Sequence, residues 1–161
     1  MGMADLPLLA LSVRQPWAWA IVHGGKRIEN RSWQAVNHGL RQRGPICIHA
    51  AKGMTQDEYW DAAEFMERID VICPEPDKLE RGGIIGIAEV VDVVSDSDDP
   101  WFFGPRGIVL DNVKPVEFIP APGALGYFTW RPGGERVPPA KWMVKEPQKS
   151  TSGDLFGRWM A

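Results

Sequence analysis

The apolar run at residues 84–94 most constrains what this chain can fold into. Ile and Val dominate the run, Glu89 and Asp92 are its only charged residues, and Gly82-Gly83 precedes it. β-branched residues favour strands, and a run this continuous lacks the alternation typical of a strand with one exposed face. We therefore expect residues 84–94 to form a buried strand in the centre of a sheet.

Shorter strand-like runs occur on both sides of this run. Each is bounded by Gly, Pro or Asn, the residues that commonly punctuate strands. We expect strands at residues 8–13, 27–33, 45–51, 107–111, 113–119 and 124–130. Many short strands with two helices favour a small mixed barrel over a parallel doubly wound sheet, so the expected fold class is mixed α/β (α+β).

Two helices are expected, both in the first half of the chain. Residues 16–23 begin with a proline, which suits the first helical position, and are followed by a Gly-Gly pair that ends the helix. Thr55 and Glu58 have the spacing of a capping box, in which each side chain bonds the other's backbone. The second helix should therefore run over residues 56–69.

The length and composition indicate one domain with one hydrophobic core. The chain has 161 residues, of which 44% are hydrophobic, enough to bury a core without metals or disulfides. After Trp130 the sequence becomes rich in Pro, Gly and Ser, which is typical of irregular structure. We expect a folded domain at residues 1–131 and an irregular C-terminal tail at residues 132–161.

Cys47 and Cys73 are expected to be free thiols, and we expect no metal and no cofactor. Cys47 and His49 are two residues apart in a predicted strand, so they face the same side, as metal ligands would. A closed metal site needs about four ligands, and no second Cys/His pair has ligand spacing. Packing is the better interpretation of this pair.

The location of the protein is expected to be cytoplasmic. No apolar run approaches the roughly 20 residues that a membrane-spanning helix requires. Residues 1–9 lack the basic and then apolar pattern of a secretory signal.

Charge is distributed unevenly although the net charge is only −3. Residues 1–52 carry +5, residues 53–111 carry −11 and residues 112–161 carry +3. Such asymmetry favours a basic face, built from the first and last thirds, that attracts phosphates. The alternative is a chance segregation of solvated charges.

Two motifs near the start carry a resemblance to a known family. Residues 11–18 read L-S-V-R-Q-P-W-A, and residues 24–31 then match the pattern G-x-K-x-x-E-x-R without a gap. Together with I-H-A-A-K-G-M at residues 48–54 and W-F-F-G-P at residues 101–105, they resemble the ASCH family, including its bacterial and phage members. The resemblance covers about residues 8–130, and several motifs in one order are more specific than the short string alone.

The resemblance implies a PUA-like β-barrel with an RNA-related role and a cleft lined by the Lys, Glu and Arg of the string. The residues themselves agree, because a nucleotide needs a cation for its phosphate, polar groups for its base edge and an aromatic plane for stacking. The expected nucleic-acid-binding residues are Arg14, Gln15, Trp17, Lys26, Glu29, Arg31, Trp33 and Lys52. The expected partner is RNA or a modified nucleotide, bound by a monomer.

Alternatives to binding remain open. The first alternative is that Glu29 pairs with Arg31 or Lys26 in a purely structural ion pair. Some family members resemble ribonucleases, for which Lys26, Glu29 and Lys52 would be the catalytic residues. Others resemble amidohydrolases acting on acetylated cytidine, with a threonine three residues after the motif lysine. This chain has Glu29 at that position, so it lacks the hydroxyl nucleophile.

The tail contains G-D-L-F at residues 153–156, which resembles the end of bacterial sliding-clamp-binding peptides. Leu155 and Phe156 are thus candidates for contact with a peptide-binding partner, although Ser152 stands where a glutamine normally opens that pattern. The alternative is that Leu155, Phe156 and Trp159 fold back onto the barrel.

Overall fold

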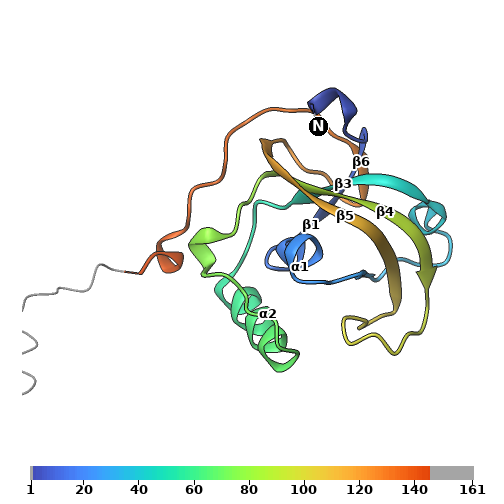
Figure 1. Ribbon diagram of the computed structural model, residues 1–161, viewed down its shortest axis with the longest axis horizontal. Coiled ribbons are helices and arrows are strands. Elements are labelled where there is room, and N and C mark those ends of the chain that lie inside the picture. The colour runs from blue at the N-terminus through green and yellow to red at the C-terminus, as the bar shows by residue number, and fades with distance from the viewer. Residues whose placement is uncertain (1, 146–161) are drawn as a thin grey trace, which may run out of the picture.

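The computed structural model describes residues 2–145, so the candidate peptide at Leu155 and Phe156 lies outside the described residues. Its centre is a six-stranded mixed sheet in the order β2-β5-β4-β3-β1-β6, curled into a half-barrel (Figure 1). The strands are β1 (Leu9–Val13), β2 (Ile28–Arg31), β3 (Gly44–Ala50), β4 (Gly83–Val94), β5 (Arg106–Pro120) and β6 (Tyr127–Thr129). The predicted α+β, barrel-like fold class is confirmed.

The helices occupy different places relative to the sheet. Helix α1 (Trp17–His23) lies within the curve of the sheet and α2 (Gln56–Arg68) lies outside it (Figure 1). Four short 3-10 turns complete the described elements: η1 (Met3–Asp5), η2 (His38–Arg41), η3 (Pro76–Lys78) and η4 (Lys141–Met143). Both predicted helices are confirmed to within a residue at each end, and the capping box of α2 is formed as the sequence indicates.

The strand predicted from residues 84–94 is β4, and its central position is confirmed. It pairs with β3 on one side and β5 on the other, both antiparallel. Ile85, Ala88 and Val90 join the core around α1, whereas Ile84 belongs to a second core cluster with Leu6 and Trp130. Burial on both faces explains why the sequence of this strand does not alternate.

The predicted break between residues 111 and 113 is wrong, because one long strand, β5, covers both predicted strands. Asn112 has a φ of 48° and donates from its side chain to Glu89 Oε2 at 2.7 Å. The pairing of β5 with β4 shifts register here, as in a β-bulge. A bulge bends and twists a strand without ending it, which is how this ribbon curls.

After β6 the chain returns to the body of the molecule and crosses toward α2 (Figure 1). Buried Arg81 donates from Nη2 to the Pro138 carbonyl at 3.0 Å, and Met143 is buried beside Met54 and Tyr59. The domain boundary at residue 131 stays a prediction. No helix in residues 2–145 is both long enough and apolar enough to cross a bilayer.

Candidate functional site

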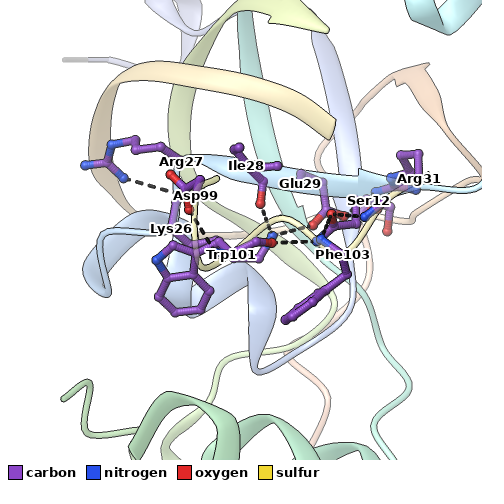
Figure 2. Close-up of polar contacts among 11 residues, drawn as sticks. Ser12, Lys26, Arg27, Ile28, Glu29, Arg31, Asp99, Trp101 and Phe103 are labelled. Carbon is purple, nitrogen blue, oxygen red and sulfur yellow. Dashed lines mark hydrogen bonds and ion pairs between the residues drawn. The ribbon is translucent and has the colours of Figure 1, made fainter. Parts of the chain in front are cut away.

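The start of β2 positions a buried group of charges. Lys26 precedes the strand, and Glu29 and Arg31 are two residues apart within it, so their side chains project to the same face. The Lys26 ammonium donates to the Ile28 carbonyl and, at 2.9 Å, to Glu29 Oε1 (Figure 2). Arg31 Nη2 donates to the other carboxylate oxygen of Glu29 at 3.0 Å. One carboxylate is thus held between two cations.

These three charged side chains are largely buried, so each needs an ionic or hydrogen-bonding partner. Lys26 is 1% exposed and Glu29 is 7% exposed, while the side chain of Arg31 retains 18%. A buried ion needs a partner, because removing it from water costs several kcal/mol. Two cations and one carboxylate leave a formal charge of +1, which favours an anionic ligand nearby.

Arg31 also ties β2 to β1. Its Nη2 donates to the Ser12 carbonyl at 2.8 Å (Figure 2). The Ser12 hydroxyl lies 3.0 Å from His49 Nδ1, and His49 Nε2 lies 2.8 Å from the Ala121 carbonyl. Burial lowers the pKa of His49 below its usual 6.5, outweighing the hydrogen bond to Ala121, and the charge of Lys52 lowers it further. A neutral imidazole that donates to Ala121 and accepts from Ser12 satisfies both contacts.

An aromatic wall faces the charges. Trp17 comes from α1 and Phe103 from the loop before β5, and their ring centroids are 6.1 Å apart in an edge-on arrangement. Asn30 of β2 fixes that loop, since it donates to the Trp101 carbonyl at 2.9 Å and accepts from the Phe103 backbone N–H at 2.7 Å. The Lys26 ammonium lies 5.8 Å from the centre of the Trp17 ring. Phe103 remains 56% exposed and is accessible for stacking.

Together these groups line an open cleft of about 350 Å³. The lining residues are Ser12, Val13, Arg14, Trp17, Lys26, Glu29, Asn30, Arg31, Ser32 and Phe103. Arg14 stands at an exposed position and makes a two-pronged pair with Glu58 at the start of α2, at 3.0 and 2.8 Å. Burial alone would raise the pKa of Glu58, but hydrogen bonds from Arg14 and the Thr55 backbone bring it below its usual value.

The cleft brings together five of the eight sequence-predicted residues, namely Arg14, Trp17, Lys26, Glu29 and Arg31. Gln15 is buried elsewhere, where it accepts from the Trp19 backbone and donates to the Glu80 carbonyl. Lys52 is exposed and is not among the lining residues, and its carbonyl accepts from Arg81. Trp33 lines a separate hollow beside the cleft.

Sequence reasoning missed several lining residues. Asn30 lies inside the matched string, but at a position where the pattern allows any residue. The pattern therefore did not single it out as a site residue. Phe103 lies in the W-F-F-G-P segment, which was noted for resemblance and not for the site. Ser12 and Val13 carried no sequence signal for the site, and Ser12 meets it through its carbonyl, which accepts from Arg31.

Comparison with models of protein families identifies the family of the chain. A family model described as "ASCH domain" matches residues 11–102, more than half of the chain. The matched range includes α1, β2 and the aromatic loop up to Phe102, so it covers nearly all of the cleft. No curated protein matches the chain.

Proposed function

The chain belongs to the ASCH domain family, and from that premise we propose that it holds single-stranded RNA or a modified nucleotide in the cleft beside β2. ASCH domains are PUA-like domains, a family generally linked to RNA binding. One observation carries the proposal. A carboxylate clamped between two cations lies next to an aromatic wall, in a cleft that opens to solvent.

Each part of a nucleotide has a matching group in the cleft. Arg31 supplies the cation for a phosphate, since its guanidinium is only partly committed to Glu29 and Ser12. Trp17 and Phe103 offer ring surfaces for a base, and Ser32 adds a hydroxyl at the rim. A volume of about 350 Å³ is within the range of small-ligand pockets.

The geometry supports holding a ligand more than cleaving one. General base catalysis requires a carboxylate free to accept a proton, whereas both oxygens of Glu29 accept hydrogen bonds from cations. Lys52, the third residue of the ribonuclease hypothesis, is outside the cleft lining. We therefore assign binding, and no bond cleavage, to this site.

The structural ion-pair hypothesis is the main competitor. The pairs it requires are formed, and they contribute to holding β2 in place. This hypothesis gives no reason for the pair to lie at an open cleft or for an exposed phenylalanine to face it. The two hypotheses differ in whether charge removal at Arg31 changes RNA affinity.

The test is titration of a fluorescently labelled single-stranded RNA, followed by anisotropy at about 50 mM and about 200 mM salt. Two phosphate contacts give a slope of roughly −1.4 in log K against log salt, and thus a fall of about sevenfold over this range. Arg31→Gln should weaken binding and reduce the slope by about 0.7, because one phosphate contact is lost.

Arg68→Gln is the matched control, since Arg68 is an exposed arginine of α2, away from the cleft lining, whose guanidinium pairs with Glu64. It should bind RNA like the wild type. Equal affinities for wild type and Arg31→Gln, with both proteins folded by circular dichroism, would refute the site. Shortening of the RNA during the titration would replace the binding assignment with cleavage.

A further inference from the structure

A second hollow lies beside the cleft and has no role so far. Its volume is about 450 Å³. It is lined by Leu9, Trp33, Asn37, His38, Gly39, Gln42, Leu125, Gly126 and Tyr127, from β1, the loop after β2 and the start of β6. Ser32 lines the cleft and the next residue, Trp33, lines the hollow, so the two sites meet at the end of β2.

Arg31 stands at the boundary between the cleft and the hollow. Its guanidinium carbon is 5.6 Å from the centre of the Trp33 ring, a cation–π distance. Trp33 in turn lies 5.7 Å from the Tyr127 ring, centre to centre. A cation is therefore placed between the aromatic wall of the cleft and the aromatic pair of the hollow.

The surroundings of the hollow are basic. Residues 32–44 include Arg41 and Arg43 and no acidic residue. Burial raises the pKa of the Tyr127 hydroxyl, the charges of Arg31 and Arg43 oppose that rise, and the charge of Glu29 adds to it. This charge distribution favours a phosphate that passes from the cleft toward the hollow.

Two buried polar atoms flank Trp33 without a partner. In residues 2–145, Arg31 Nε and Tyr127 Oη are the only buried side-chain nitrogen or oxygen atoms that make no hydrogen bond. Such atoms are rare in folded proteins, because each forfeits roughly 1–3 kcal/mol. The Tyr127 hydroxyl is protonated at neutral pH, burial raises its pKa further, to about 12, and its hydrogen bond is left unmade.

We propose that the hollow at Trp33 and Tyr127 takes a second nucleotide, so that the cleft and the hollow hold two consecutive nucleotides of a single-stranded RNA. The phosphate that joins them lies at Arg31, and the second base stacks on Trp33. This inference rests on the proposed function of the cleft. It specifies the ligand as an oligonucleotide, where the cleft alone would suit a mononucleotide.

The experiment compares a uridine 5′-monophosphate with the dinucleotide and tetranucleotide of uridine, by calorimetry on the full chain. Stacking of one added base corresponds to roughly 5-fold to 150-fold in affinity. The dinucleotide should therefore bind at least about fivefold more tightly than the mononucleotide. The tetranucleotide should add much less, because the cleft and the hollow together hold two nucleotides.

Trp33→Leu should remove this gain, so that the dinucleotide binds no more tightly than the mononucleotide does. Tyr127→Phe is a second, milder variant, which keeps the ring and should reduce only dinucleotide affinity. Trp60→Leu is the matched control, since Trp60 is 59% exposed on α2, and it should leave both affinities as in the wild type. Melting temperatures establish that the variants are folded.

The outcomes separate the two hypotheses. If the wild type binds none of the three ligands, the proposed function fails and the inference fails with it. If it binds the mononucleotide and the dinucleotide equally, or if Trp33→Leu and Tyr127→Phe both retain the dinucleotide gain, only the second site is refuted.

Discussion

His49 is a buried titratable residue whose contacts define its protonation. It is 1% exposed, and its two ring nitrogens contact Ser12 on β1 and the Ala121 carbonyl. A second proton would have to displace the hydroxyl that donates to Nδ1, and burial disfavours the cation in any case. The folded protein therefore holds this histidine neutral.

A pH dependence of stability follows from the lowered pKa of His49. In the unfolded chain this residue takes up a proton near pH 6.5, whereas in the fold it does so only at lower pH. The unfolded state thus binds more protons below that pH, and the free energy of unfolding should fall by up to about 1.4 kcal/mol per pH unit as the pH drops below 6.5. Urea denaturation between pH 7.5 and pH 5 measures it.

Two glutamine variants test this prediction, one at His49 and one, as a control, at His38. His49→Gln should be less stable at pH 7.5 and should lose this part of the pH dependence, while His38→Gln, at an exposed histidine, should keep the wild-type curve. Parallel curves for wild type and His49→Gln would contradict the assignment.

The sequence was enough to predict which residues form the site, but not how deeply they are buried. The string at residues 24–31 indicated Lys26, Glu29 and Arg31, and strand alternation correctly placed the last two on one face. Their burial was not predictable, because it depends on how α1 packs and on the loop at Phe103, which is distant in sequence. For the same reason Gln15, adjacent to the cleft in sequence, is buried against Glu80 instead.

At the scale of elements, the bulge at Asn112 shapes the longest strand pair. The left-handed backbone conformation at φ 48° suits asparagine or glycine and costs other residues about 1–2 kcal/mol. Asn112→Val should lower the free energy of unfolding by about that amount, and more with loss of the hydrogen bond to Glu89. Asn112→Gly keeps the backbone conformation accessible, so it should be nearer the wild type in denaturant titration.

Equal stability of the valine and glycine variants would show that the bulge is not strained. The sequence misled at this element because asparagine signals both turns and bulges. Local sequence identifies the residue with positive φ, but the pairing with β4 decides whether the strand stops or continues. By contrast, the start of α2 was predictable because a capping box is formed entirely within four residues.

At the scale of the whole molecule, the segment after β6 is fastened to the body. Met143 is 2% exposed and packs with Met54, Tyr59 and Leu79. Met143→Ala should lower the free energy of unfolding by about 2–5 kcal/mol, as for other buried methionines. Val144→Ala, at a residue that is 50% exposed, is the control and should change little.

Thermal melting of these two variants also tests the domain boundary predicted at residue 131. If Met143→Ala melts at the wild-type temperature, the folded unit ends near residue 131, as predicted. The composition of residues 132–145 predicted irregular backbone, which they largely have, but composition alone does not reveal that an irregular segment packs on a core.

The position of β2 in the sheet has a consequence for how such a protein diversifies. Within residues 2–145, β2 is an edge strand of the sheet and pairs with β5, and it carries Glu29, Asn30 and Arg31 within a few codons of Lys26. Most of the core is supplied by other elements. A few point mutations in this short stretch of coding sequence can therefore change the ligand preference while most of the core stays as it is, provided that the buried Lys26 keeps a partner.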